Sequence, residues 1–186
     1  QAFAYFDMRT KNYPEALSLL RRAQNLAPRD SGAGLKMVAL FEVQKNWSEA
    51  LSRAKMLQEK FPEDPIVADT LGRVYRESGD QASSTKTFSA AATKFSKSAV
   101  ILAHYARALT LEKKYSQALS LTTRAISLDP GNEVLKNNAV YLNFLTQGSD
   151  SAVRTAATFL APGKPKEPFG VLVTTRILEQ NGHRTD

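Results

Sequence analysis

The sequence predicts an all-α fold of repeated helical hairpins, and two observations support this prediction. The first is an amphipathic segment, Tyr115 to Leu128, whose apolar residues fall at 118, 119, 121, 125, 126 and 128. That spacing fits the period of about 3.6 residues of an α-helix and does not fit the alternation of a strand. The second is the proline that follows it, Pro130, which recurs at Pro28 and Pro62. Because these prolines stand 34 and 68 residues apart, we infer a 34-residue repeat, a length typical of helical arrays.

Every repeat also carries a small residue twelve positions before its proline position: Ala16, Ala50, Ser84, Ala118 and Ala152. We expect this residue where the second helix of a hairpin crosses the first, because a large side chain there would push the two helix axes apart. Proline has no amide hydrogen and cannot continue a helix, so it marks the end of the second helix.

The helices can be placed in order from these positions. The expected first helices of the hairpins are residues 31–44, 65–78, 98–112 and 133–146. In three repeats an aromatic residue stands just before the expected second helix: Tyr13, Trp47 or Tyr115. Four polar residues are expected to be N-caps or first-turn residues of second helices: Ser48, Asp80, Ser116 and Asp150.

The first helix of the third repeat has the clearest apolar pattern. We expect its packed face to comprise Ile66, Val67, Leu71, Gly72, Val74 and Tyr75. A glycine inside a helix costs about 1 kcal/mol relative to alanine, so Gly72 predicts a close approach between two helices.

The C-terminal part departs from the repeat pattern. A stretch rich in proline at 162–168 predicts a non-helical connector, and 169–181 predicts one more helix. We therefore divide the chain into an array of about five repeats at 1–166 and a terminal helix at 167–186. This helix is either a cap or the first half of a sixth repeat. Both ends of the sequence fall inside repeats, which leads us to expect a longer array.

The composition narrows the range of functions. The net charge of +7 favours acidic partners or anionic surfaces. The chain has no cysteine, and its two histidines, His104 and His183, are too far apart in sequence to suggest a metal site. No phosphate-binding glycine loop or nucleophile motif occurs, so we expect neither catalysis nor a cofactor. No apolar run is long enough to cross a bilayer, and the sequence leaves periplasm and cytoplasm equally open as compartments.

These repeats resemble the tetratricopeptide repeat family. The resemblance is carried by Leu71-Gly72, Tyr75, Gly79-Asp80 and Phe88 in the third repeat, and by Tyr115, Ala118, Ala125 and Asp129-Pro130 in the fourth. It implies antiparallel helix pairs stacked into a right-handed superhelix, an α-solenoid, whose first helices line a concave groove. It also implies that this groove binds a segment of a protein partner. The carboxylate clamp of chaperone-binding members is not expected here, because Leu35 and Asp69 stand where that clamp has lysine.

Equivalent residues of successive repeats form rows on the first helices. One row is Ala39, Arg73, Arg107 and Tyr141, and the neighbouring row, three positions earlier, is Lys36, Thr70, His104 and Asn138. If the family geometry holds, both rows face the groove. We then expect a basic strip of partner contacts made of Lys36, Arg73, Arg76, His104 and Arg107, ending in Asn138, Tyr141 and Phe144.

Such a strip would receive an acidic peptide or a carboxylate through charge-assisted hydrogen bonds. The alternative is that these are ordinary solvated charges, partly paired along each helix. Asp69 and Glu77 each lie four residues from Arg73, whereas Arg107 has no acid three or four residues away. Arg73 can therefore form ion pairs within its own helix, whereas Arg107 cannot.

We therefore expect a non-enzymatic scaffold for protein–protein interaction, part of a longer repeat protein. Bacterial envelope, secretion and exopolysaccharide-export systems offer analogies for its setting. Two alternatives remain open. Single-stranded RNA binding, as in pentatricopeptide arrays, would suit the charge, although those repeats are typically one residue longer. The other alternative is a regulatory or assembly arm of a larger enzyme.

Overall fold

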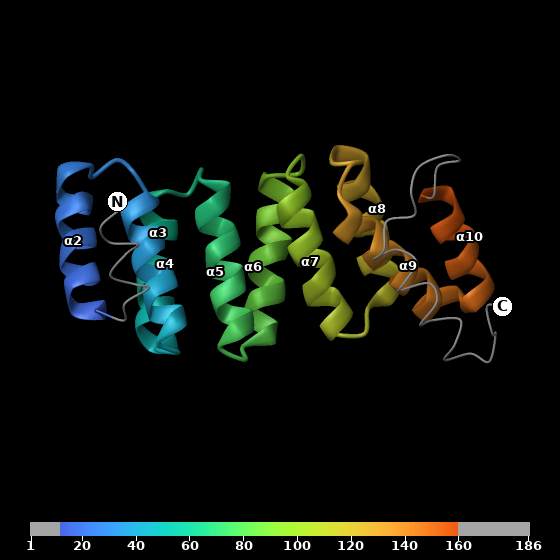
Figure 1. The fold of residues 1–186 in the computed structure, drawn as a ribbon, viewed down its shortest axis with the longest axis horizontal. Helices are drawn as coiled ribbons and strands as arrows, with labels where there is room; N and C mark the ends of the chain where they lie inside the picture. The colour runs from blue at the N-terminus through green and yellow to red at the C-terminus, as the bar shows by residue number, and fades with distance from the viewer. Residues whose placement is uncertain (1–11, 160–186) are drawn as a thin grey trace. The chain divides into compact units, whose positions relative to one another are not determined.

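The computed structural model describes residues 12–159, and within this range it contains α-helices and no strand (Figure 1). With the labels of Figure 1, the helices are α2 Tyr13–Leu26, α3 Gly32–Val43, α4 Trp47–Lys60, α5 Pro65–Glu77, α6 Gln81–Lys94, α7 Ala99–Leu111, α8 Tyr115–Leu128, α9 Glu133–Gln147 and α10 Ser149–Phe159. The four expected first helices correspond to α3, α5, α7 and α9, and their bounds agree with the expected ranges to within a residue.

The chain divides into two compact units, Gln1–Thr93 and Lys94–Asp186, which we call unit 1 and unit 2. In unit 1, α3 packs against α2, α4 and α5, and α4 packs against both α3 and α5. In unit 2, α8 packs against α7 and α9, and α9 packs against α10. Within each unit these helices are thus buried by their neighbours in sequence, as expected for stacked hairpins in which stability is distributed along the chain.

The small residues expected at helix crossings are buried in every repeat. Ala16, Ala50, Ser84 and Ala118 are fully buried, and Ala152 is 1 % exposed. Ser84 takes the place of an alanine without leaving its hydroxyl unsatisfied, because its Oγ donates a hydrogen bond of 2.8 Å to the carbonyl oxygen of Gly72. This bond joins α6 to α5 inside unit 1.

Gly72 marks the closest approach between α5 and α6, as the sequence predicted. A Cβ atom at this position would lie 2.7 Å from the ring of Phe88, which is fully buried. Gly34 has the same role between α3 and α4, because a Cβ there would lie 2.5 Å from a methyl carbon of Leu57. The glycines remove a side chain where the neighbouring helix fills the space.

Each unit contains apolar clusters of its own. Unit 1 holds one cluster: Leu20, Met37, Val38, Phe41, Ala50, Ala54, Leu57, Val67, Leu71 and Val74. Unit 2 holds a cluster of Ala106, Leu109, Ala118 and Leu142, and another of Val140, Ala152 and Ala156. The prediction of the packed face of α5 is wrong at one residue, because Ile66 is 62 % exposed. It is the second residue of α5, in the first turn of the helix, and its side chain is left open to solvent.

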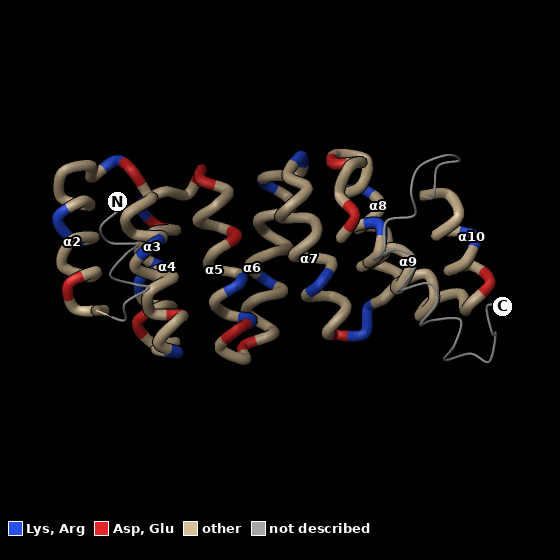
Figure 2. Tube along the Cα trace, viewed as in Figure 1, with Lys and Arg blue, Asp and Glu red and all other residues tan. Residues whose placement is uncertain are grey.

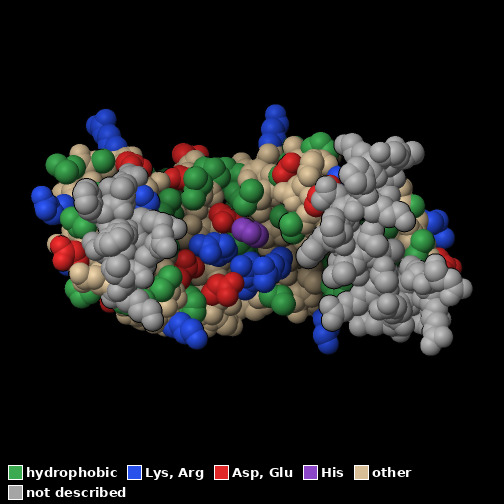
Figure 3. All heavy atoms as spheres, in the orientation of Figure 1, with side chains coloured by type: hydrophobic (Ala, Val, Ile, Leu, Met, Phe, Trp, Pro, Cys, Tyr) green, Lys and Arg blue, Asp and Glu red, His purple; other side chains and the backbone are tan. Residues whose placement is uncertain are grey.

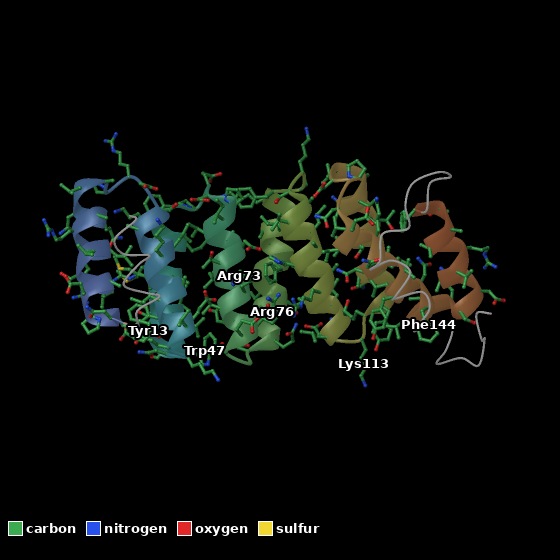
Figure 4. The ribbon with its side chains drawn as sticks, in the orientation of Figure 1. Tyr13, Trp47, Arg73, Arg76, Lys113 and Phe144 are labelled. Atoms are coloured by element: carbon green, nitrogen blue, oxygen red, sulfur yellow. The ribbon has the colours of Figure 1, made fainter. Side chains whose placement is uncertain are left out.

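The turn inside each hairpin places one residue in the left-handed backbone region. Glycine fills this position at Gly79 (φ 91°) and Gly148 (φ 83°), but lysine fills it at Lys45 (φ 55°) and Lys113 (φ 60°; Figure 4). A side chain in this region crowds the backbone, and only glycine adopts it freely. Two of these four hairpin turns in residues 12–159 therefore close with some backbone strain.

Polar caps begin most of the helices. Asp80 precedes α6, and its carboxylate accepts a hydrogen bond of 3.0 Å from the backbone N–H of Ser83. This bond holds the pKa of Asp80 below its usual value, so its contribution is present at neutral pH and is lost as the carboxylate protonates in acid. Asn46 caps α4 in the same way, whereas Ser48 and Ser116 lie in first turns.

The predicted terminal helix at 167–186 and the connector before it lie outside the described residues. Within 12–159, none of the helices combines the length and the apolar character that crossing a membrane requires.

We predict that Gly72→Ala lowers the free energy of unfolding by about 1–3 kcal/mol, because the added methyl group collides with the Phe88 ring. Urea unfolding followed by circular dichroism measures the change. Gly32→Ala is the matched control, since a Cβ there meets only the Asp30 side chain, at 3.2 Å. Equal stability of the two variants would show that α5 and α6 do not approach as described.

We also predict opposite effects at two hairpin turns. Gly79→Ala should lower the melting temperature, with a loss of about 1 kcal/mol that comes from the backbone alone, because a Cβ at Gly79 meets no atom within 4 Å. Lys113→Gly should raise it by relieving the same strain. Thermal unfolding of both variants checks the pair, and shifts of the same sign would contradict the assignment.

Candidate functional site

We define the first-helix face of each unit by the predicted contacts on its first helices. In unit 1 these are Lys36 on α3 and Arg73 and Arg76 on α5, and in unit 2 they are His104 and Arg107 on α7 and Asn138 and Tyr141 on α9. The predicted strip is thus divided between the two units.

Arg73 is held between two carboxylates in unit 1. Its Nη2 lies 3.3 Å from Oε2 of Glu42 on α3, and its Nε lies 3.8 Å from Oδ2 of Asp69 on α5. Arg73 is 34 % exposed, and both acids are 15 % exposed. The sequence anticipated Asp69, four residues away, but not Glu42, which lies 31 residues earlier. The ion pair with Glu42 connects the first helices of neighbouring repeats.

Arg76 has a different environment on the same helix (Figure 4). Its Nε and Nη2 donate to Oε1 of Glu77 at 3.2 and 3.0 Å, so Glu77 pairs with Arg76 and not with Arg73. The Arg76 side chain is 9 % exposed, and its buried Nη1 has no hydrogen-bond acceptor among the described residues. A buried donor without an acceptor costs about 1–3 kcal/mol.

The charges of unit 1 are balanced on this face. Lys36, Arg73 and Arg76 stand with three acids on the same two helices: Glu42, Asp69 and Glu77. On α5 the acids Asp69 and Glu77 stand on either side of the two arginines in sequence. Figure 2 shows both charges on this helix, and Figure 3 shows both kinds of side chain close together over it. The face as a whole therefore carries little net charge.

Arg107 dominates the first-helix face of unit 2. Its side chain is exposed on α7 and forms no hydrogen bond or ion pair with any residue in 12–159. The residues three and four positions away are Ala103, His104, Thr110 and Leu111, none of which is acidic. His104 is half-buried, one turn from Arg107.

On α9, Asn138 is exposed and Tyr141 is 46 % exposed. Sequence reasoning missed the residue beside them. Asn137 is 8 % exposed, and its buried Nδ2 has no acceptor in the described part of the chain. It occupies the register position of Asp69, two repeats further on, which was the available signal.

A row of aliphatic side chains was also missed. Ile66, Val100 and Val134 are the second residues of α5, α7 and α9, each separated from the next by one repeat. They are 62, 58 and 64 % exposed. Their identical register could have revealed the row, but the amphipathic pattern assigned Ile66 to the packed face. The first-helix faces thus combine hydrogen-bond donors with exposed apolar side chains.

The described residues contain no group of three histidines, aspartates or glutamates that could hold a metal ion. The side chains that do gather on the first-helix faces are guanidinium, amide, phenol and aliphatic groups. They are suited to binding by charge, hydrogen bonding and apolar contact.

We predict that Arg73→Met destabilises the protein by about 1 kcal/mol, a value reduced for the partial exposure of Arg73, because Glu42 and Asp69 would then repel each other without a cation between them. Urea unfolding measures the loss. The double variant Arg73→Met with Glu42→Gln should recover most of it, and an additive further loss would contradict the bridging role of Arg73.

No family model matches the sequence, and no curated protein matches it significantly. Solved structures do match in fold. Yeast Tom70 superposes with a TM-score of 0.81 at 18% identity, over 98% of this chain and 40% of that one. PilW, a widely conserved type IV pilus biogenesis factor, gives 0.75 at 14% identity, over 98% and 84%. YrrB, a tetratricopeptide repeat protein with an unusual peptide-binding site, gives 0.65 at 15% identity, over 97% and 89%. With its all-α class and antiparallel helix pairs, the chain therefore has the tetratricopeptide repeat fold, an α-solenoid.

Proposed function

We propose that this chain is a non-enzymatic scaffold that holds a segment of a protein partner against its first-helix faces. The observation that carries the proposal is the row of Ile66, Val100 and Val134, all more than half exposed at one register. Each unit thus exposes aliphatic side chains on its first helices, Ile66 in unit 1 and Val100 and Val134 in unit 2, and a protein partner would remove them from water. The donors on the same helices would fix the orientation of that partner.

The comparisons support this role by analogy. YrrB shares the fold and is described as having a peptide-binding site, and PilW is described as a pilus biogenesis factor. The second likeness favours, within the proposal, a place in a bacterial envelope system. Fold alone does not carry function, so the argument depends on the exposed side chains of this chain.

A library of random peptides displayed on phage tests the proposal. We expect peptides to be enriched on the wild-type protein and to crosslink to p-benzoylphenylalanine placed at Ile66 or at Tyr141, which is 46 % exposed. Met56 is the matched control position, because it is 57 % exposed but lies on the second helix α4. A failure to enrich any peptide, or equal crosslinking from Met56, would count against a first-helix binding site.

The net charge of +7 favours one alternative, single-stranded RNA binding. Fluorescent RNA titrated at about 50 and 200 mM salt separates the two, since binding through many phosphates weakens steeply with salt. We expect no tight binding at either salt concentration. Tight binding that collapses at the higher salt would replace the protein-partner proposal with the RNA alternative.

A further inference from the structure

The two units differ in whether the arginine at one repeat position is paired with acidic side chains. Arg73 and Arg107 occupy the same position in successive repeats. Arg73 is paired with Glu42 and Asp69, whereas Arg107 has no partner in 12–159. One repeat after Asp69 stands Ala103, so the acid on the same helix does not recur. Equivalent arginines therefore have different roles, and only Arg107 retains an unused positive charge.

The acids of unit 2 do not compensate for it. The described residues 94–159 contain four acids against eight lysines and arginines: Glu112, Asp129, Glu133 and Asp150. Three of the four are engaged elsewhere. Glu112 pairs with Lys114 at 2.7 Å, Glu133 pairs with Lys136 at 2.6 Å, and Asp129 accepts from Asn132 at 2.9 Å. The positive charge of Arg107 is thus left without a partner among the described residues and is available to a bound group.

Other side chains on α7 and α9 indicate the chemistry of the segment that would carry the group bound by Arg107. Asn137 contributes a buried amide donor without an acceptor in the described residues, which a carbonyl oxygen would satisfy. Val100 and Val134 contribute exposed aliphatic surface, and Tyr141 an exposed ring. The helices α7 and α9 both pack on α8, which places these residues on one hairpin stack. The combination is complementary to an acidic segment with apolar side chains.

We propose that the first-helix face of unit 2 binds a partner segment that carries a carboxylate beside aliphatic or aromatic residues, with Arg107 as the anchoring cation. A carboxylate suits the planar guanidinium, which donates two parallel hydrogen bonds. Val100, Val134 and Tyr141 take the apolar side chains. Arg73 is a positioning residue that ties α3 to α5. The inference rests on the proposed function and adds the chemistry of the partner and the residue that selects it.

The peptides enriched on the wild-type protein provide the test. We expect them to contain more aspartate and glutamate, next to apolar residues, than the input library. Labelled with fluorescein and titrated by anisotropy, they should bind Arg107→Glu about tenfold or more weakly than the wild-type protein, because a charge-assisted pair becomes a like-charge contact. Arg124→Glu is the matched control: it makes the same charge change on α8, at another exposed residue of unit 2. It should shift the dissociation constant by less than about twofold, an effect of net charge alone.

The outcomes separate the two proposals. Enriched peptides that bind Arg107→Glu as tightly as the wild-type protein, or that contain no excess of acids, would overturn this inference and leave the proposed function standing. Equal weakening by Arg107→Glu and Arg124→Glu would also overturn it, since net charge would then explain the loss. The failure to enrich any peptide would remove the proposed function as well. Circular dichroism confirms that each variant is folded, which is expected because both arginines are exposed.

Discussion

The hairpins of this protein depend on small residues at the points where the two helices of a pair cross. In unit 1 the ring of Phe88 lies against Gly72, and Ser84 is small enough to bond directly to the Gly72 carbonyl. Alanines take the equivalent position of Ser84 in the other hairpins. Because interiors are close-packed, such a contact fixes the rotation of each helix as well as its distance. The contact thereby determines which face of a first helix remains exposed to solvent.

That rotation has a direct consequence for the charges. On α5 it leaves Asp69 and Arg73 on the side that faces α3, where Glu42 completes the ion pair. On α7 the same rotation presents Arg107, but the equivalent of Asp69 is an alanine. The strip predicted from the sequence was uniformly basic. In the structure its charges are balanced in unit 1, whereas in unit 2 Arg107 has no acidic partner among the described residues. This difference is the basis of the proposal that Arg107 selects the partner, because paired charges have less to offer a ligand.

Much of the fold was predictable because the signals are local. The period of about 3.6 residues, the prolines and the small residues all reflect contacts within one helix or one hairpin. They placed the first helices to within a residue and identified Gly72 as a close approach. The exception was Ile66, whose apolar character fits the pattern although it is exposed. Hydrophobicity alone does not report whether an apolar side chain at a helix end is buried.

The candidate site was less predictable, because its important relations join distant positions. The register of the repeats brought Arg73, Arg107 and Tyr141 into one row, and the lack of an acid near Arg107 was visible along the helix. The partner of Arg73 across the helix pair, Glu42, was not visible, and neither was the unsatisfied amide of Asn137. The sequence by itself determined the repeat, the helices and the crossing residues, since each depends on spacing along the chain. Only the tertiary structure decided which charges neutralise each other and which donors remain unsatisfied, since these depend on distances between helices that spacing does not encode.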